Sequence, residues 1–137
     1  MKFTLEIITP QRQAFSEEVE RVTVPSSAGV LGILAHHEPL FTSLSEGEIK
    51  ITTGTKEYFL AIGGGFMEVG HDKVTILVSR AVHADELNEA EIKKAQESAK
   101  SVISRKATAE EMASAQAMMR RSILDMKVLH KRKHRSL

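Results

Sequence analysis

The amino-acid sequence changes character near Asp85. Before this residue, apolar and polar side chains alternate in short runs, as in residues 3–7, and turn-forming residues separate the runs at intervals of about 8–12 residues. After it, the stretch from Asn88 onward contains neither proline nor glycine and is rich in alanine, glutamate and lysine, which favour helices. The sequence therefore predicts a mixed fold, with an N-terminal antiparallel β-sandwich over residues 1–86 and a C-terminal α-helical hairpin over residues 87–137.

Two helix-start signals divide the C-terminal part. Asn88 with Glu91, and Thr108 with Glu111, have the spacing of a capping box, so a helix is expected to begin at each, with a break near residues 105–107. The residues expected on the apolar helix faces are Ala95, Ala99, Val102 and Ile103 in the first helix and Met112, Ala115, Met119, Leu124 and Met126 in the second. Because alanine and methionine supply less apolar area than leucine, and burial contributes only about 25 cal/mol per Å², we expect a marginal hairpin that can undock from the sandwich.

The run from Ala28 to Leu40 lies between two strand-like segments. It contains two glycines, Gly29 and Gly32, together with an apolar stretch and a pair of histidines. We interpret the run as one loop, in which glycine permits positive φ angles or a close approach to another backbone. Because loops carry function more often than the elements they connect, this run is a candidate contact site.

Three consecutive glycines, residues 63–65, lie between two expected strands. No helical sequence follows them, as it would in a dinucleotide-binding loop. The pattern therefore favours a tight bend or close backbone packing over a phosphate cradle.

Both glycine-containing segments carry a family resemblance. The first follows the pattern Gly-x-x-Gly-Ile-Leu-x-x-His-x-Pro-Leu at Gly29, Gly32, Ile33, Leu34, His37, Pro39 and Leu40. The second, residues 63–77, follows a Ser-Gly-Gly-Phe-x-Glu-Val-x-x-x-x-Val-Thr-Ile-Leu pattern, with Gly63 in place of the serine. With both motifs in this order, the chain resembles the epsilon subunit of bacterial-type rotary ATP synthases over nearly its whole length.

The resemblance implies a non-catalytic subunit in the central stalk of the proton-translocating ATP synthase. Its sandwich would couple the gamma subunit to the c subunits of the rotor ring, and its C-terminal helices would inhibit ATP hydrolysis. The residues that match the family's contacts with gamma and the ring are Ser27, Gly29, Val30, Leu31 and His37. Many relatives carry an acid at the position of Val30, so the resemblance does not extend to a salt bridge there. For His37, contact with gamma and a hydrogen bond within its own loop remain equal alternatives.

The charge of the chain is distributed unevenly. Residues 1–86 contain seven Lys and Arg against twelve Asp and Glu, whereas residues 87–137 contain twelve against six. The resemblance assigns the basic end to inhibitory contact with acidic segments of the catalytic head, which alpha and beta subunits form. The residues matched to this contact are Arg120, Arg121, Lys127, Lys131 and Arg132.

Two other interpretations of the basic end stay open. It can be a solvated, frayed tail, as chain ends often are. It can also bind nucleic acid, since Lys and Arg clusters neutralise phosphates, which would make the chain a basic-tailed nucleic-acid-binding protein. No aromatic residues interleave with the basic ones, so we expect no nucleic-acid partner.

Some members of the family bind ATP at the base of the hairpin. In this chain, Asn88 stands where those members carry aspartate and Glu91 where they carry arginine, while Arg121 keeps a basic position. Because Glu91 would repel a triphosphate, we expect ATP to bind weakly or not at all, and we expect no cofactor.

The sequence contains no recognisable catalytic or metal-binding pattern. It has no cysteine, no phosphate-binding loop and no nucleophile elbow. His36 and His37 are neighbours that would point in opposite directions on an extended backbone, so no metal site is expected. There is no signal-peptide pattern and no apolar run of membrane-spanning length. The resemblance therefore implies a peripheral protein at the cytoplasmic face of the bacterial cell membrane, held there only through its complex.

Overall fold

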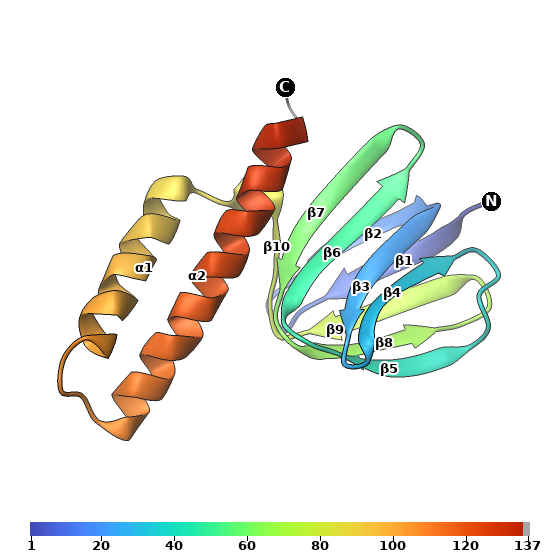
Figure 1. Ribbon diagram of the computed structural model, residues 1–137. Helices are drawn as coiled ribbons and strands as arrows, with labels where there is room; N and C mark the ends of the chain where they lie inside the picture. The colour runs from blue at the N-terminus through green and yellow to red at the C-terminus, as the bar shows by residue number, and fades with distance from the viewer. Residues whose placement is uncertain (136–137) are drawn as a thin grey trace. The chain divides into compact units, whose positions relative to one another are not determined.

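A computed structural model describes the backbone of residues 1–135 and the side chains of residues 1–131. The chain divides into two compact units, the first spanning Met1–His83 and the second beginning at Ala84. The first unit is built from strands and the second from helices (Figure 1). The mixed β-sandwich and helical-hairpin fold expected from the sequence is confirmed.

The first unit contains ten strands in two layers (Figure 1). Their bounds are β1 Phe3–Ile8, β2 Gln13–Val19, β3 Arg21–Ser26, β4 Gly29–Leu34, β5 Leu40–Leu44, β6 Gly47–Thr53, β7 Lys56–Ile62, β8 Gly65–Val69, β9 Lys73–Val78 and β10 Ala81–His83. The strand order is β10-β7-β6-β3-β5-β8-β9-β1-β2, with β4 paired to β3. The pairings are antiparallel except for β1 with β9, which is parallel. The sandwich is thus antiparallel with one parallel pair, which local alternation does not reveal.

Period-two alternation determines which side chains enter the core. In β1, Phe3, Leu5 and Ile7 are buried, while the intervening residues are half-buried on the opposite face. The largest side chains removed from solvent in this unit include Ile33, Ile49, Ile51, Leu60, Ile62, Met67 and Ile76. Burial of this continuous cluster supplies the apolar driving force for the sandwich.

The two layers join differently at their two sides. At one side, the end of β3 pairs with β5 of the other layer. This pairing consists of one residue pair, Ser26 with Leu44. At the other side, β2 and β10 end the strand order and are joined by side chains. The Arg12 guanidinium donates to the carbonyl oxygen of Ala81 at 2.7 Å, and His83 Nε2 lies 2.6 Å from the carbonyl oxygen of Ala14.

The interpretation of residues 28–40 as one loop is wrong. Residues 29–34 form strand β4, which pairs along its full length with β3, and only residues 35–39 connect it to β5. The apolar stretch is a strand because alternate residues pack inward, with Ile33 fully buried. The expected positive φ is present at Gly29, which has φ 123° at the end of the β3–β4 turn.

The glycine run at residues 63–65 provides close backbone packing, as predicted. A Cβ on Gly65 would lie 2.0 Å from the carbonyl oxygen of Leu77 in the adjacent strand β9. A Cβ on Gly63 would lie 2.3 Å from the hydroxyl of Ser79. The absence of side chains here lets β8 approach β9 closely.

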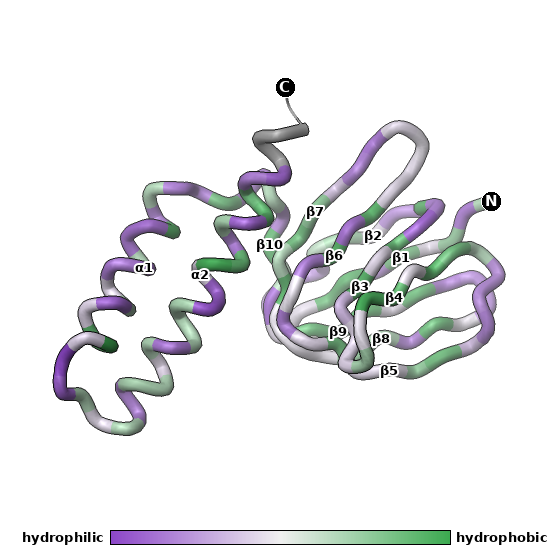
Figure 2. Tube along the Cα trace, viewed as in Figure 1, coloured by the Kyte–Doolittle hydropathy of each residue, from purple (hydrophilic) through white to green (hydrophobic). Residues whose placement is uncertain are grey.

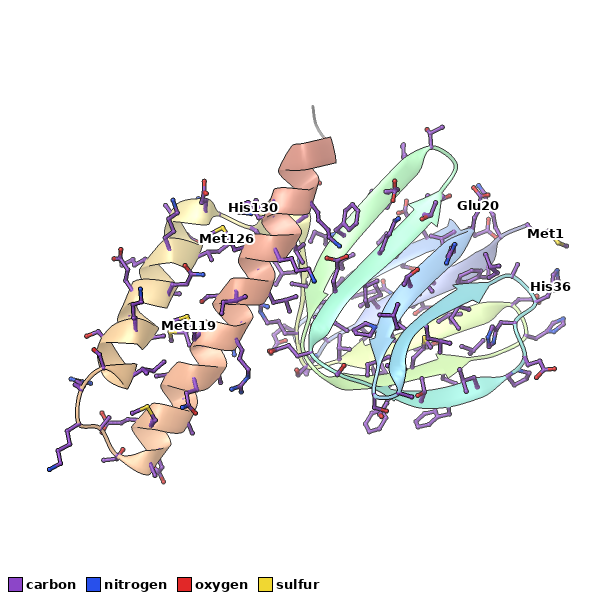
Figure 3. The ribbon with its side chains drawn as sticks, in the orientation of Figure 1. Met1, Glu20, His36, Met119, Met126 and His130 are labelled. Carbon is purple, nitrogen blue, oxygen red and sulfur yellow. The ribbon has the colours of Figure 1, made fainter. Side chains whose placement is uncertain are left out.

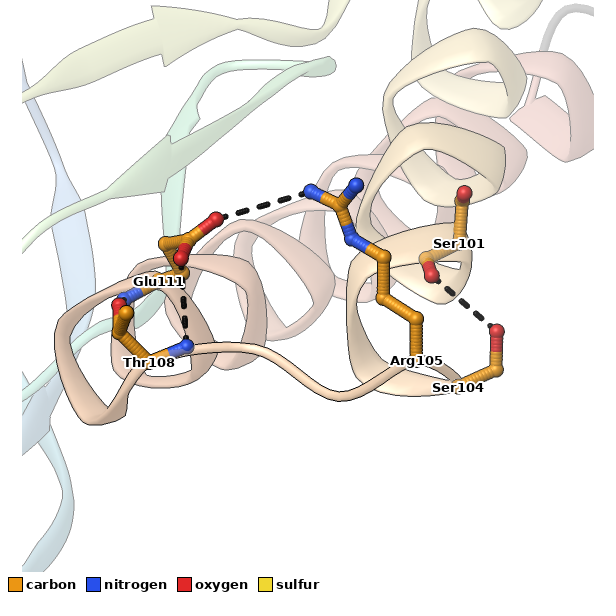
Figure 4. A network of polar contacts seen from close by, with 5 residues as sticks. All are labelled: Ser101, Ser104, Arg105, Thr108 and Glu111. Atoms are coloured by element: carbon orange, nitrogen blue, oxygen red, sulfur yellow. Dashed lines mark hydrogen bonds and ion pairs between the residues drawn. The ribbon is translucent and has the colours of Figure 1, made fainter.

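The second unit contains a short 3-10 helix η1 (Ala84–Glu86) and two helices, α1 (Glu89–Ile103) and α2 (Ala109–Arg135). Both predicted helix starts are confirmed. Asn88 Oδ1 accepts from the backbone N–H of Glu91, which caps α1. At α2, the Thr108 hydroxyl accepts from the Glu111 N–H, and the Glu111 carboxylate accepts from the Thr108 N–H (Figure 4).

The turn between the helices is held by one further ion pair. Arg105, which follows α1, lies 3.6 Å from the Glu111 carboxylate at the start of α2 (Figure 4). Hydrophilic and hydrophobic residues alternate along both helices, as expected for amphipathic elements (Figure 2). Two small residues, Ala99 and Ala115, are buried, and a groove of about 370 Å³ remains between the helices beside them. The helix interface is therefore thin near this turn, in keeping with the composition of its faces.

Candidate protein-docking surfaces

The β3–β4 turn and the first residues of β4 carry the residues matched to the rotor ring, from Ser27 to Leu31. Ser27 is fixed to strand β5 by two hydrogen bonds: its N–H donates to the Ser43 carbonyl at 3.1 Å, and the Ser43 hydroxyl donates to the Ser27 hydroxyl at 2.8 Å. Val30 is 79% exposed, and Leu31 is half-buried against the core. The turn thus presents an apolar side chain on a firmly held backbone.

The histidines lie in the segment between β4 and β5, and Figure 3 labels His36 at the margin of the sandwich. His36 has φ 65°, an unusual value for a residue other than glycine, and its ring centroid lies 6.4 Å from that of His71 in the β8–β9 turn. His37 Nδ1 lies 2.8 Å from the carbonyl oxygen of Glu38, so the alternative of a hydrogen bond within the loop is present. His37 is half-buried between the exposed residues His36 and Glu38, and its contact with gamma remains a prediction.

An exposed apolar stripe crosses the outer face of strands β5, β8 and β9. Its members are Phe41, Phe66 and Leu77, which are 66%, 51% and 51% exposed. The rings of Phe41 and Phe66 stack at a centroid distance of 5.6 Å, and Phe66 lies directly opposite Leu77 in the β8–β9 ladder. Soluble proteins seldom expose a contiguous aromatic surface of this kind unless something binds to it.

This apolar stripe was not among the residues predicted from the sequence. Phe66 and Leu77 belong to the second glycine-containing motif but are not predicted from it as contact residues, and Phe41 belongs to neither motif. Each lies at an outward position of its strand, where an apolar residue breaks the alternation expected for a solvated face. That break was the available signal, although only the strand pairing reveals that the three residues adjoin.

The apolar stripe lies between the two predicted contact regions. Ser43, which holds the β3–β4 turn, is directly opposite Phe66 in the β5–β8 ladder. The β8–β9 turn, which carries His71 beside His36, lies at the other end of the same strands. The turn, the stripe and the histidine segment therefore line one side of the sandwich.

The polar part of this outer face contains a charged pair. Lys73 Nζ lies 2.5 Å from a carboxylate oxygen of Glu6. The hydrogen bond from Lys73 lowers the pKa of Glu6 below its ordinary value, with a smaller contribution from Gln13. Lys73 is thus already engaged by Glu6 of strand β1.

On helix α2, three of the residues matched to inhibitory contact are exposed. Arg120 and Lys127 are seven residues apart and lie on one helix face, together with Ile123, which is 57% exposed. Arg121 is also exposed, whereas Lys131 is half-buried and makes an interaction within the structure. The side chain of Arg132 lies outside the described residues. Sequence reasoning missed Ile123, whose spacing from Arg120 and Lys127 was the available signal.

The residues at the matched ATP position have a structural role at the start of α1. The Asn88 side-chain oxygen is occupied as the helix cap, at 3.1 Å from the N–H of Glu91. Glu91 and Arg121 are both exposed. The weak ATP binding expected from the sequence stays a prediction.

Within residues 1–131, no group of three or more His, Cys, Asp or Glu side chains is arranged to hold a metal ion. Among the described helices, none is long and apolar enough to cross a membrane.

Comparison with known proteins identifies relatives along the whole chain. The profile of the family "ATP synthase, Delta/Epsilon chain, beta-sandwich domain" matches residues 2–84. The ATP synthase epsilon chain of Dehalococcoides mccartyi is 39% identical over 133 residues, covering 96% of this chain and 95% of the relative. That of Herpetosiphon aurantiacus is 38% identical over 135 residues, covering 98% and 99%.

Solved structures support the fold. A chain of the Euglena gracilis mitochondrial ATP synthase (OSCP/F1/c-ring) aligns with TM-score 0.66 and 21% identity over 99% of this chain and 82% of that one. A chain of the Tetrahymena thermophila mitochondrial ATP synthase (central stalk/c-ring) aligns with TM-score 0.62 and 18% identity over 94% and 97%. With the full-length relatives, these findings show that the chain belongs to the family of ATP synthase epsilon chains, which are non-catalytic subunits of that complex.

Proposed function

We propose that the chain is a central-stalk subunit whose sandwich docks on the gamma subunit and the rotor ring, and whose helices inhibit ATP hydrolysis. Family membership supports a place in the ATP synthase. The observation that carries the docking role is the apolar stripe of Phe41, Phe66 and Leu77.

The apolar stripe suits a large protein partner. Aromatic side chains dominate the binding energy of protein interfaces, and a stacked pair presents a rigid surface with little entropy left to lose. The stripe lies on the side of the sandwich that also carries the β3–β4 turn and the histidine segment. One surface can therefore contact gamma through the stripe and His37, while the turn contacts the c subunits.

The contact with the ring would be apolar. Val30 is an exposed side chain at the start of β4, directly after the β3–β4 turn, and Gly29 permits the backbone geometry that presents it. Ser27 would hold the turn against β5 under load through its bonds to Ser43. Because Val30 carries no charge, binding to the ring should depend less on salt concentration than it would with an acidic residue at this position.

The inhibitory contact would use the outer face of α2. Arg120 and Lys127 flank the exposed Ile123, so a cationic face surrounds an apolar centre. This combination suits acidic segments of the alpha and beta subunits, because charge complementarity guides association while the apolar residue is desolvated.

The proposal implies a peripheral position at the cytoplasmic face of the bacterial cell membrane, reached only through the complex. Coupling to proton transport would then be indirect, through rotation of the ring. The nucleic-acid alternative is disfavoured by family membership, and purified protein that carries no nucleic acid in a dye-based assay would agree with that.

A pair of substitutions tests the docking role. Phe66→Ser is expected to weaken association with a catalytic assembly of alpha, beta and gamma subunits, because it removes half of the aromatic stack. Val30→Ser is expected to leave that association unchanged and to weaken association with the rotor ring. Loss of both contacts by either substitution, with the fold intact by circular dichroism, would contradict the separation of the two surfaces.

Truncation tests the inhibitory role. ATP hydrolysis by the complex is compared for the full chain and for a chain ending at Glu86. Higher hydrolysis with retained assembly supports inhibition by the helices, and equal rates contradict it. Arg120→Ala with Arg121→Ala should also raise hydrolysis, whereas the matched control Lys94→Ala with Lys106→Ala, which removes two exposed cations elsewhere in the hairpin, should not.

A further inference from the structure

One charged side chain lies within the apolar stripe. Glu68 is an exposed residue of β8, directly opposite Phe41 in the β5–β8 ladder. Phe66 precedes it by two residues and therefore faces the same way. The Glu68 carboxylate consequently lies beside both members of the aromatic stack.

Glu68 has no partner within the described part of the chain, where no hydrogen bond or ion pair involves its carboxylate. The outward-facing lysine of the neighbouring strand is Lys73. On β9, Thr75 is directly opposite Glu68 of β8 on one side and Glu6 of β1 on the other. Lys73 lies two residues before Thr75 on the same face and is therefore diagonal to both glutamates. It bonds to Glu6 at 2.5 Å, and Glu6 also accepts from Gln13.

Docking on the apolar stripe would change the surroundings of Glu68. A partner that covers Phe41 and Phe66 also removes water from the Glu68 carboxylate beside them. An isolated carboxylate is costly to desolvate, and the centres of interfaces are accordingly depleted of unpaired charge. The cost is offset when the partner supplies a cation in hydrogen-bonding geometry.

We propose that Glu68 is the polar anchor of the docking stripe and pairs with a Lys or Arg of the gamma subunit that covers Phe41 and Phe66. This inference rests on the proposed docking role and adds to it the chemistry of the partner surface. The charge of the sandwich agrees, because residues 1–83 contain seven Lys and Arg against ten Asp and Glu. The apolar stacking supplies contact area, and Glu68 fixes the register and excludes surfaces without a matching cation.

The test measures binding of the full chain to an immobilised assembly of alpha, beta and gamma subunits that lacks this chain, at low and high salt. Glu68→Gln keeps the shape and removes the charge, and it is expected to weaken binding about tenfold and to reduce its salt dependence. Glu68→Lys is expected to weaken binding about a hundredfold or more, because two cations would meet. The matched control is Glu18→Gln, an exposed glutamate on strand β2 away from the apolar stripe, and it should bind like the unaltered chain.

The Phe66→Ser variant distinguishes two hypotheses: that Glu68 pairs with a cation of gamma, and that gamma binds the apolar stripe at all. Binding lost with Phe66→Ser but unchanged with Glu68→Gln would overturn the anchor and leave the docking stripe standing. Binding unchanged with Phe66→Ser would overturn both. Equal weakening by Glu68→Gln and Glu18→Gln would also overturn the anchor, because the effect would then be one of overall charge.

Discussion

At the scale of single residues, neighbouring glycines in this chain have different roles. A Cβ on Gly65 would lie 2.0 Å from the backbone oxygen of Leu77, whereas one on Gly64 would lie 3.4 Å from the nearest atom, the oxygen of Leu44. The first position requires glycine because its neighbour is backbone that cannot move aside. The second has room for a methyl group at ordinary contact distance.

Gly65→Ala is therefore expected to destabilise the sandwich by about 3 kcal/mol, the cost of forcing atoms into a packed interior. The measurement is the free energy of unfolding in urea. Gly64→Ala is the control and should change stability by less than about 1 kcal/mol. Equal losses would indicate that β8 and β9 are more loosely packed than the distances show.

The capping box at Thr108 makes the stability of the second unit depend on pH, because the box includes the Glu111 carboxylate. The backbone N–H of Thr108 bonds to the Glu111 carboxylate, and this bond, followed by the one to the Thr108 side chain, lowers the pKa of Glu111. A lowered pKa means that the folded state favours the charged carboxylate. Its stabilisation is therefore complete above the unfolded pKa, about 4.3, and is lost as the pH falls through the folded value.

We expect the thermal midpoint of the helices, followed at 222 nm, to fall between about pH 5 and pH 3. Glu111→Gln should lower the midpoint at pH 7 and flatten this dependence. Glu110→Gln, which neutralises the adjacent exposed acid, should retain it. An identical pH profile for Glu111→Gln and the unaltered chain would refute the role of the box.

At the scale of elements, the helical hairpin has a weak interface near its turn. Near the turn, the buried apolar residue of α2 is the small Ala115, and the large ones, Val128 and Leu129, come only toward the far end of the helix. Two buried residues between these positions, Ser122 and Asp125, are polar. Ser122 bonds to the Met118 carbonyl within the helix. Polar residues at these positions contribute less apolar burial than the sequence pattern alone suggests.

Ser114→Leu should strengthen the hairpin. Ser114 is an exposed residue that lines the groove of about 370 Å³ between α1 and α2. Leucine there would cover apolar surface and favour the helix, raising stability by about 1 kcal/mol in urea unfolding of the helices. Ser101→Leu places the same residue on an exposed part of α1 that does not line the groove, and a similar gain from it would show that helix propensity alone is responsible.

At the scale of the whole sandwich, closure depends on a few long-range contacts. The strand order begins with β10 and ends with β2, and these outer strands meet through Arg12 with Ala81 and through His83 with Ala14. Phe15 packs edge-on against Tyr58 beside this seam, at a centroid distance of 5.8 Å. These side-chain hydrogen bonds connect the two outer strands, as backbone hydrogen bonds connect neighbouring strands within a layer.

Arg12→Ala should open the seam. It leaves the Ala81 carbonyl without its donor, and we expect a loss of about 1–2 kcal/mol in the free energy of unfolding of the sandwich. Arg21→Ala, which removes an exposed arginine from strand β3, is the control and should cost less than about 0.5 kcal/mol. Comparable losses from the two would argue against a seam held by Arg12.

The sequence by itself determined the features that depend on near neighbours along the chain. Alternation located strands such as β1, although it did not locate all ten. The caps at Asn88 and Thr108 located both helix starts, because a cap bonds to a backbone group only three residues away. The same reasoning assigned residues 29–34 to a loop, since glycines weaken a strand pattern locally even where pairing with β3 makes up for it.

Only the tertiary structure decided which strands lie side by side. The parallel pairing of β1 with β9 and the positions of Phe41, Glu68, Phe66 and Leu77 on one face follow from registers between segments far apart in sequence. Local periodicity fixes which face a side chain points to but not which strand adjoins it, because the register is set by packing of the whole core. The candidate docking surface therefore became visible only when the strands were paired.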